Sequence, residues 1–519
     1  MRWNCAALCA ALSLFVTGGT GYAQDVVLSS RDGQVEITGT LLGFDGEFYR
    51  LETVYGEMTV DGSGVNCAGP GCPNLQDFVA DIAVSGSATM GALLVPALLE
   101  GFAQRNGFAT TRDDIDETHF TYTLIDSRTD KRVAIFRFRT TNSDEGFADL
   151  LVNEADVVMS LREIRSEEQA RAQEAGMGDL THPNRSRVLA LDAIVPIVSP
   201  QNPVTEISPQ DLAAIYAGQV TNWSKLGGPN APIALHAPAA QSGLGQAAED
   251  RLFAPAGVKI APVATRHIRG DSMARAVVRD PFAIGLASYA ETGNAQSVTL
   301  KGSCGRVLNA TRRSIKTEDY PLTAPMFLYT PARRLPKIGR DFMAFALGPI
   351  AQIVIRRAGF VDQAAEEVPI DQQGNRFANA ILGAGEEVEL TELQRMTRVL
   401  SPMKRLTISF RFEAGSTRLD AQSRSNVVQV ARDLERGLYD ARRLLFVGFS
   451  DGQGPAERNR QIAFERAEAV RDAVVNAAET ADLLQVDVQV DAFGEALPLA
   501  CDNSAWGRQA NRRVEVWVR

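Results

Sequence analysis

The chain has 519 residues, of which 45% are hydrophobic, 22% charged and 7% aromatic. At roughly 100–200 residues per domain this length predicts three to five domains, and the composition excludes wholesale disorder and fibrous folds. The formal net charge of −10 provides no overall basic field, so we expect no nucleic-acid partner. Four histidines occur and no two have metal-ligand spacing, so we expect neither a metal site nor another cofactor.

The N-terminus has the features of a secretory signal peptide, which we assign to residues 1–23. Arg2 supplies the positive charge, an apolar stretch follows, and the segment ends at Ala23 in a small-x-small cleavage pattern. We therefore expect cleavage after Ala23 and export to the periplasm. Beyond this segment no stretch approaches the roughly 18 uncharged apolar residues of a membrane span, so we expect a soluble or peripherally attached protein.

Export would permit disulfide bonds among the four cysteines that remain after cleavage. Cys67 and Cys72 flank an Ala-Gly-Pro-Gly turn, which predicts a disulfide between them. Zinc binding is the competing interpretation, but no second cysteine or histidine pair completes a site. Cys304 and Cys501 fall in different predicted domains, and the sequence leaves open whether they are paired or free.

Composition and hydrophobic patterning divide the remaining chain into four parts. Residues 24–77 carry short strand signals separated by glycine turns, which predicts a small β domain with a packing or docking role. Residues 78–362 alternate β-like runs with amphipathic helical stretches, which indicates an α/β architecture. Residues 363–402 are a polar linker with one helix, and residues 403–519 have a β-α-β-α-β order. For the small β domain, an outer-membrane or transporter partner remains open.

An acidic and a basic residue are placed together near the C-terminus. A buried strand ends at Phe449, Asp451 follows it, and Arg466 lies on the next predicted helix, for which we expect Asn459 at the N-cap. A carboxylate and a guanidinium that face one groove suit a zwitterion, because one accepts from an ammonium and the other binds a carboxylate. The alternative is an ion pair on the surface with no function.

The wider pattern resembles the OmpA-like peptidoglycan-binding family over about 110 residues. Its markers are Asp451-x-x-Gly454-x4-Asn459-x6-Arg466 and the ending Asn511-Arg512-Arg513-Val514-Glu515. The resemblance implies that Asp451 takes the ammonium and Arg466 the carboxylate of diaminopimelate in the stem peptide, with Asn459 and Arg512 lining or bracing the pocket. Glu465 replaces an arginine of the family pattern, and we expect this acid to weaken the hold of Arg466 on a carboxylate.

Three Ser/Gly loops punctuate the α/β region. They contain Ser87 with Thr89, Ser160 with Arg162, and Ser242 with Gly243. Backbone N–H groups and hydroxyls in such loops can hold an oxyanion, although serine and glycine are also the ordinary residues of turns.

The sequence around these loops resembles the phosphate-type periplasmic substrate-binding family, through segments such as Thr221-Asn222-Trp223 and Ala283-Ile284-Gly285. The resemblance implies a two-lobed α/β fold of type II that closes on a ligand by a hinge, with the three loops lining the cleft. Pro238 stands where the family has an arginine, and Arg162 is the candidate to replace that charge. Phosphate, another small anion, a cell-wall fragment and no small ligand remain open.

A serine hydrolase using Ser242 is the rival function. The surrounding Ala-Gln-Ser-Gly-Leu is not a Gly-x-Ser-x-Gly elbow, and His267 is the only histidine close downstream, so we expect no catalysis. The sequence therefore predicts a multidomain binding protein with a small N-terminal β unit, a two-lobed α/β substrate-binding fold and a C-terminal α+β OmpA-like domain. We expect it to be bound to the cell wall and peripherally associated with the outer membrane.

Overall fold

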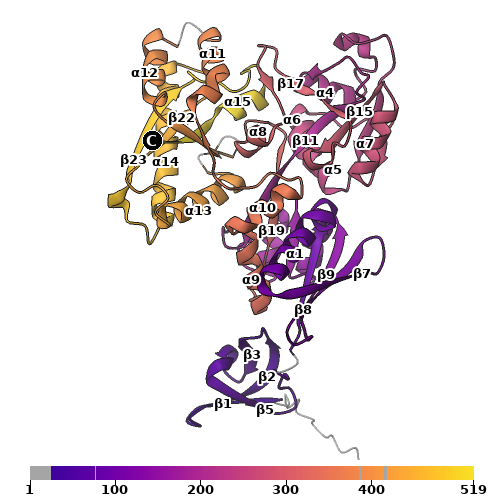
Figure 1. Ribbon diagram of the computed structural model, residues 1–519, viewed down its shortest axis with the longest axis vertical. Helices are drawn as coiled ribbons and strands as arrows, with labels where there is room; N and C mark the ends of the chain where they lie inside the picture. Colours follow the sequence, from indigo (N-terminus) through magenta and orange to yellow (C-terminus); the bar gives the residue numbers. More distant parts are fainter. Residues whose placement is uncertain (1–24, 76–77, 385–387, 414–415, 417) are drawn as a thin grey trace, which may run out of the picture. The chain divides into compact units, whose positions relative to one another are not determined.

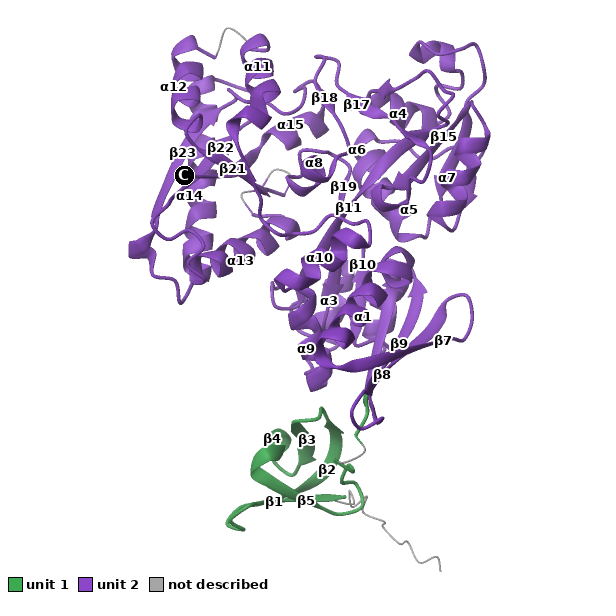
Figure 2. Cartoon of the chain, in the orientation of Figure 1, with its two compact units in different colours: residues 1–80 green, residues 81–519 purple. Residues whose placement is uncertain are grey.

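The computed structural model describes residues 25–75, 78–384, 388–413, 416 and 418–519 (Figure 1). The expected signal peptide at residues 1–23 lies outside them. The chain divides into two compact units, residues 1–80 and residues 81–519 (Figure 2).

The first unit is an antiparallel sheet with the strand order β4-β3-β2-β1-β5, which confirms the expected N-terminal β unit. Its strands are β1 (Val26–Ser30), β2 (Glu36–Phe44), β3 (Phe48–Thr53), β4 (Gly56–Asp61) and β5 (Val65–Ala68). Alternate residues of β1 and β3, among them Leu28 and Tyr49, form its small core. Cys67 in β5 is disulfide-bonded to Cys72. The short β5 gives no strand signal of its own in the sequence.

The second unit begins with the two lobes of the expected α/β fold. Strands β11 (Ser186–Val198) and β19 (Thr323–Tyr329) cross between them, because β11 pairs with β19 through its first half and with β15 through its second. In the first lobe, the sheet continues through β10, β6, β9, β8 and β7, and in the second through β15, β13 and β14. This arrangement confirms the two-lobed prediction.

The other elements of the first lobe are β6 (Ala80–Ser87), α1 (Val95–Asn106), β7 (Phe108–Asp114), β8 (His119–Asp126), β9 (Arg132–Thr141), α2 (Ser143–Leu151), β10 (Val157–Ser160), α3 (Ser166–Glu174), α9 (Lys337–Ala346) and α10 (Pro349–Arg357). Those of the second lobe are β12 (Glu206–Ile207), α4 (Pro209–Tyr216), β13 (Ala234–Pro238), α5 (Gly243–Ala248), α6 (Ala254–Ala256), β14 (Thr265–His267), α7 (Gly270–Arg279), β15 (Ala283–Ser288), β16 (Gln296–Ser297), β17 (Thr299–Lys301), β18 (Val307–Leu308) and α8 (Arg312–Lys316).

The C-terminal sheet has the order β20-β21-β24-β22-β23. Its elements are β20 (Glu367–Val368), α11 (Gly374–Leu382), α12 (Leu390–Leu400), β21 (Lys404–Arg411), α13 (Ala421–Glu435), β22 (Arg443–Phe449), α14 (Ala456–Ala477), β23 (Asp487–Gly494), α15 (Ala505–Asn511) and β24 (Arg513–Val518). Helices α13 and α14 cover one face of the sheet, and α11 and α12 cover the other. The segment predicted as a linker thus supplies an edge strand and two covering helices.

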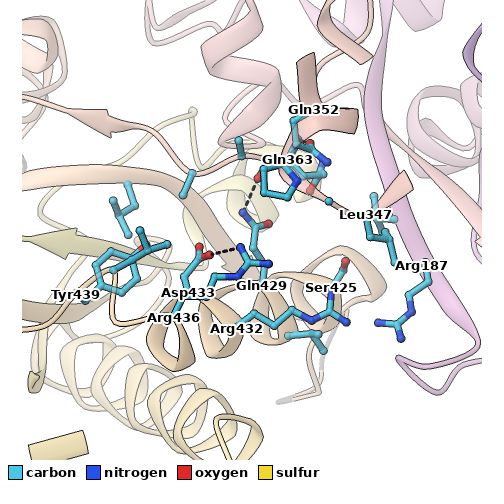
Figure 3. Close-up of a pocket in the computed structure, with 18 of the residues that line it drawn as sticks. Arg187, Leu347, Gln352, Gln363, Ser425, Gln429, Arg432, Asp433, Arg436 and Tyr439 are labelled. Atoms are coloured by element: carbon cyan, nitrogen blue, oxygen red, sulfur yellow. Dashed lines mark hydrogen bonds and ion pairs between the residues drawn. The ribbon is translucent and has the colours of Figure 1, made fainter. Parts of the chain in front are cut away.

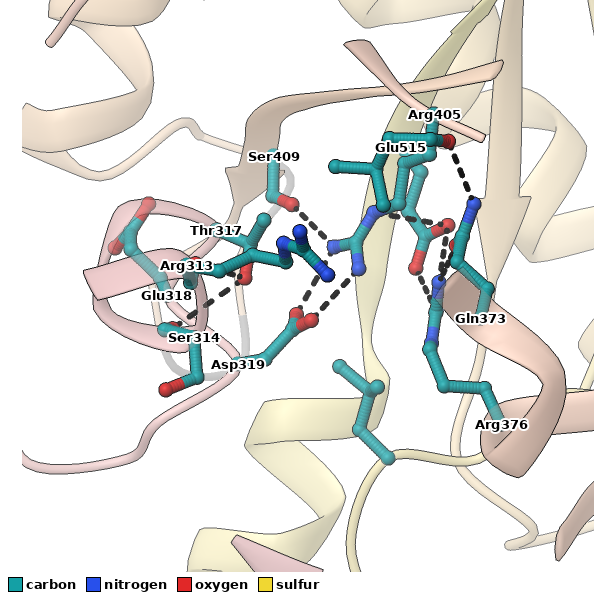
Figure 4. A network of polar contacts seen from close by, with 12 residues as sticks. Arg313, Ser314, Thr317, Glu318, Asp319, Gln373, Arg376, Arg405, Ser409 and Glu515 are labelled. Carbon is teal, nitrogen blue, oxygen red and sulfur yellow. Dashed lines mark hydrogen bonds and ion pairs between the residues drawn. The ribbon is translucent and has the colours of Figure 1, made fainter. Parts of the chain in front are cut away.

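Buried charges join the lobes to the C-terminal sheet (Figure 4). Arg405 of β21 donates to Asp319, which follows α8, at 2.6 Å, and Arg411 donates to the carbonyl of Glu318 at 2.7 Å. Fully buried Glu515 of β24 accepts from Arg513 at 2.7 Å. A disulfide between Cys304 and Cys501, which the sequence left open, adds a covalent link between the same two parts.

Among the described residues no single helix has the length and apolar composition needed to cross a membrane. Helices α9 and α10 meet those criteria only as a pair, and they are bent by 71° at the break between them.

The buried pair of Lys316 and Asp362 provides a test of this packing. The lysine Nζ lies 2.9 Å from Asp362 Oδ1, and the two side chains are 2% and 0% exposed. Lys316→Met should lower the free energy of unfolding by about 3 kcal/mol, because it leaves a buried carboxylate without its main counter-charge. Lys337→Met removes a lysine from an exposed pair with Asp341 and should change the same quantity by less than about 1 kcal/mol. Urea unfolding measures the free energy of unfolding of both variants. Equal losses would contradict the conclusion that the Lys316–Asp362 pair is buried.

Candidate functional site

The C-terminal site is built where strand β22 ends. The N–H of Ser450 donates to the carbonyl of Gly494 in the neighbouring strand at 2.9 Å, so Asp451 emerges at the edge of the sheet. Helix α14 then runs back along β22 and carries Arg466. A Cβ added at Gly448 would lie 1.9 Å from the carbonyl oxygen of Ala463, so only glycine lets the helix lie this close to the strand. This contact holds the helix that carries Arg466 against the strand that leads to Asp451.

Asp451 is already paired within the protein. Its Oδ2 accepts from Nη1 of Arg512 at 2.5 Å, and its Oδ1 accepts from the N–H of Gln453 at 3.2 Å. The Asp451 side chain is 12% exposed and that of Arg512 is 27% exposed. The direct ion pair of Arg512 with the acid is consistent with the bracing role expected for it.

Arg466 has no such partner in the part of the chain that the structure describes. Its guanidinium lies over the ring of Phe412, 5.2 Å from the centroid, and its buried Nε has no hydrogen-bond acceptor among the described residues. Burial lowers the pKa of Arg466, Arg512 lowers it further, and Asp451 opposes the shift. Arg466 therefore interacts electrostatically with both Arg512 and Asp451, so that two guanidiniums and one carboxylate influence one another. Such an excess of positive charge favours a ligand that brings a carboxylate.

Asn459 is not the N-cap that the sequence predicts. The N-cap of helix α14 is Pro455, four residues before the expected N-cap. Proline is tolerated at the start of a helix, because the first N–H groups of a helix have no partner within it and proline has no N–H to leave unpaired. Asn459 is buried in the first turns, and its Nδ2 lies 3.2 Å from both the Gly454 carbonyl and Glu495 Oε2. Its observed contacts connect the loop after Asp451 to Glu495.

The expected interference of Glu465 with Arg466 is not supported by the geometry. Glu465 is exposed and its Oε1 accepts from Nε2 of Gln461 at 2.9 Å. Consecutive residues on a helix do not face each other, so this acid turns away from the site.

Asn511 and Asp502 are site residues that sequence reasoning missed. Fully buried Asn511 accepts from the N–H groups of Leu499 and Ala500 at 2.7 and 2.9 Å, and it donates to Asp502 at 2.8 Å. Asp502 in turn accepts from the N–H of Gly452 at 3.0 Å. These bonds connect the loop after β22 to the segment before Arg512. The sequence feature that could have identified Asn511 is its position as the first residue of the Asn-Arg-Arg-Val-Glu motif.

The first two Ser/Gly loops lie side by side in the first lobe. Strands β6 and β10 are parallel neighbours, and Ser87 and Ser160 are their last residues. Gly86, with φ +125°, permits this pairing because a Cβ there would lie 2.1 Å from the carbonyl oxygen of Met159. Both serines are fully buried, and Ser160 Oγ donates to the Arg162 carbonyl at 2.7 Å. Half-buried Thr89 precedes the helical turn that follows β6.

The third loop, from the second lobe, touches the first. Ser242 caps α5, where its Oγ accepts from the N–H of Gly245 at 3.1 Å and donates to the Ala239 carbonyl at 2.7 Å. A Cβ added at Gly243 would lie 3.1 Å from Ser87 Oγ and 3.0 Å from Leu161 Cδ1. The structure thus brings the loops of both lobes together, with the apolar side chain of Leu161 where they meet.

Contrary to the expectation, Arg162 does not replace the missing guanidinium of the third loop. Its side chain is 5% exposed and binds both carboxylate oxygens of Glu168, at 2.6 and 2.8 Å, as well as Asp144. It also lies over the ring of Phe147. Two carboxylates already neutralise its charge, so it has none to offer an anion between the lobes.

A hydrolytic arrangement around Ser242 is disfavoured by the geometry. His267 Nε2 lies 2.8 Å from His236 Nδ1, and its Nδ1 lies 3.4 Å from Ser272 Oγ. Burial lowers the pKa of both histidines. In the described part of the chain no histidine hydrogen-bonds to Ser242, whose hydroxyl is used at the helix cap.

Comparison with protein families identifies two regions. The family model described as "PBP superfamily domain" matches residues 76–349, which is more than half of the chain, and the OmpA family model matches residues 411–512.

Individual proteins resemble the first region. The chain is 25% identical over 228 residues to Protein SphX of Synechococcus elongatus, covering 42% of this chain and 65% of that protein. It is 22% identical over 211 residues to the phosphate-binding protein PstS of Staphylococcus aureus, covering 39% and 62%. The chain thus spans less than two thirds of the length of these relatives. An ABC-type phosphate transport receptor from Vibrio cholerae is 22% identical, with a TM-score of 0.41 and coverage of 54% of this chain and 99% of the receptor.

The contact at Gly448 generates a prediction about the C-terminal site. Gly448→Ala should lower the free energy of unfolding by about 1–3 kcal/mol, because helix α14 has to move away from β22. The matched control is Gly374→Ala at the start of α11, where an added Cβ meets nothing within 4 Å. That change should be neutral or stabilise by up to about 1 kcal/mol. Denaturant titration compares the two, and a neutral Gly448→Ala would show that the helix does not depend on this contact.

Proposed function

We propose that the chain, which belongs to the PBP superfamily and carries an OmpA family domain after it, is an exported binding protein held on peptidoglycan by its C-terminal domain. The observation that carries the proposal is Arg466, which lies over Phe412 with no carboxylate partner among the described residues and interacts electrostatically with the Asp451–Arg512 ion pair. One carboxylate with a surplus guanidinium can receive a group that bears both an ammonium and a carboxylate.

We propose diaminopimelate of the peptide stem as that group. Its carboxylate would lie on Arg466, whose guanidinium has no carboxylate partner among the described side chains, and its ammonium on Asp451. Arg512 would hold Asp451 in place from the other side, and Asn459 would hold the loop. Because the close contact of α14 with β22 at Gly448 holds the helix of Arg466 against the strand that leads to Asp451, the fold itself would contribute to recognition.

The proposed location is the periplasm, with peripheral attachment to the outer membrane. The signal-peptide pattern and the bridges Cys67–Cys72 and Cys304–Cys501 support export to an oxidising compartment. We propose that the N-terminal β unit serves an outer-membrane or transporter partner.

For the cleft we propose binding of phosphate or another small anion rather than catalysis. The relatives named above include a phosphate-binding protein, and the loops of Ser87, Ser160 and Ser242 meet between the lobes. Pro238 and the neutralised Arg162 supply no guanidinium there. The anion would therefore be held by hydroxyls and backbone N–H groups, together with Thr89 and Gly243.

Retention on purified murein that contains diaminopimelate tests the anchoring. Asp451→Asn and Arg466→Gln should each weaken retention about tenfold or more, because each removes a charge-assisted hydrogen bond. Retention by the wild type should also fall as salt is raised. The matched controls are Glu465→Gln, next to Arg466 but facing away, and Arg471→Gln, on the same helix and paired with Asp472. Equal retention of all five proteins would remove the anchoring role.

Isothermal titration calorimetry with inorganic phosphate tests the cleft. Ser242→Ala should weaken binding by about tenfold, because it removes a hydroxyl and loosens the start of α5. Ser208→Ala removes the matching cap of α4 and should leave phosphate binding unchanged. No heat with phosphate for the wild type would overturn the proposal for this ligand. Esterase activity that disappears in Ser242→Ala would instead favour the hydrolase.

A further inference from the structure

A cavity of about 490 Å³ lies where the first lobe meets the C-terminal sheet (Figure 3). Its walls come from the start of β11, the junction of α9 and α10, the segment after Asp362, and helix α13. Apolar side chains line much of it, among them Val188, Leu347, Val428 and Leu438. The volume falls within the roughly 300–1,000 Å³ range of small-molecule sites in proteins.

Two arginines at this cavity have no carboxylate partner in the described part of the chain. They are Arg187 of β11, whose Nη2 donates to the amide oxygen of Asn184 at 2.9 Å, and Arg432 of α13. Figure 3 shows their guanidiniums reaching toward each other. Burial and, secondly, the charge of Arg432 lower the pKa of Arg187 to about 10. Two like charges therefore repel each other in a half-buried place.

The other charges of the cavity are already matched. Arg436 lies 3.6 Å from Asp433, and Arg442 lies 2.7 Å from Glu367. Burial raises the pKa of Asp433 to about 6, although Arg436 and Arg432 oppose the shift. Four arginines thus line the cavity against two carboxylates, and the unmatched positive charge belongs to Arg187 and Arg432.

A buried donor at the same cavity also lacks an acceptor. The side-chain Nε2 of Gln363 is buried and has no hydrogen-bond partner among the described residues. Its Oε1 accepts from Gln422 and its backbone groups bond to Gln352 and Gln429, so the rest of the residue is satisfied. Buried polar groups in native proteins are normally hydrogen-bonded, so this donor is an exception, and it lies in the wall of the cavity beside Gln352 and Gln429 rather than beside the two arginines (Figure 3).

We propose that this cavity is a second ligand site that binds an amphipathic organic anion, an apolar body that carries a carboxylate or phosphate group. The anionic group would lie between Arg187 and Arg432 and relieve their repulsion, and the apolar body would cover Val188, Leu347 and Val428. Because Arg187 stands on the strand that crosses between the lobes and Arg432 on a helix of the OmpA domain, the ligand would connect the two parts. The site is separate from Asp451 and from the three Ser/Gly loops.

Isothermal titration calorimetry on the full mature chain tests the site with four probes. Sodium decanoate and decyl phosphate carry the two anionic groups on the same apolar chain, 1-decanol carries the chain without charge, and inorganic phosphate carries the charge without the chain. We expect at least one of the amphipathic anions to bind, and to bind at least tenfold more tightly than decanol. The better of the two identifies the headgroup.

Variants locate the bound probe. Arg187→Gln and Arg432→Gln should each weaken its binding at least tenfold, and Val428→Phe should do the same by filling the cavity while it leaves every charge in place. Arg398→Gln removes an exposed arginine of α12 and should have no effect. The Ser242→Ala variant should bind the amphipathic probe with the affinity of the wild type, which would show that the probe does not occupy the cleft between the lobes. Thermal unfolding of each variant checks that it is folded.

Three results would overturn the proposal, the third of them tight binding of decanol. One is the absence of heat with both decanoate and decyl phosphate on the wild type. Another is an unchanged affinity in the folded double variant Arg187→Gln/Arg432→Gln, which would place the probe elsewhere. Tight binding of decanol would likewise show a purely apolar cavity with no preference for an anion.

Discussion

The close contact between strand β22 and helix α14 is the constraint on which the C-terminal site depends. Gly448 lets the helix backbone approach within reach of the strand, and the approach places Arg466 near the Asp451–Arg512 pair. Without it, Asp451 would be an acid paired with one arginine, a common and idle surface arrangement. With it, Arg466 adds to this pair a second guanidinium that has no carboxylate partner among the described residues.

The same domain is joined to the two-lobed part by buried polar contacts as well as by a disulfide. Arg405 and Asp319 form an ion pair across the boundary, and Cys304 is bonded to Cys501 close to the loop of Asp502. Removing one partner of a buried ion pair is strongly destabilising, because the other charge is left uncompensated. A wall-binding domain that is attached in this way would carry the lobes with it, whereas a flexible linker would let them move freely.

Much of the fold could be predicted from sequence because its signals are local. The alternating valines after Arg513, the strand up to Phe449 and the Ser/Gly loops depend on periodicity and turn chemistry, which neighbouring residues determine. The edge strand β20 and helix α11 were missed, because the polar residues around Gln372 have long-range partners that periodicity does not reveal. For the same reason, the pairing of Arg512 with Asp451 and of Arg162 with Glu168 could not be predicted. Arg512 and Asp451 are 61 positions apart, and tertiary packing brings them together. Arg162 has several acids near it in the sequence, and tertiary packing decides which of them it binds.

The most direct measurement is a crystal structure of the chain with a bound murein peptide that contains diaminopimelate. The account predicts the diaminopimelate carboxylate within hydrogen-bond distance of the Arg466 guanidinium and its ammonium on Asp451, with Arg512 still beside that acid. A peptide bound elsewhere, with Arg466 unchanged over the ring of Phe412, would contradict it.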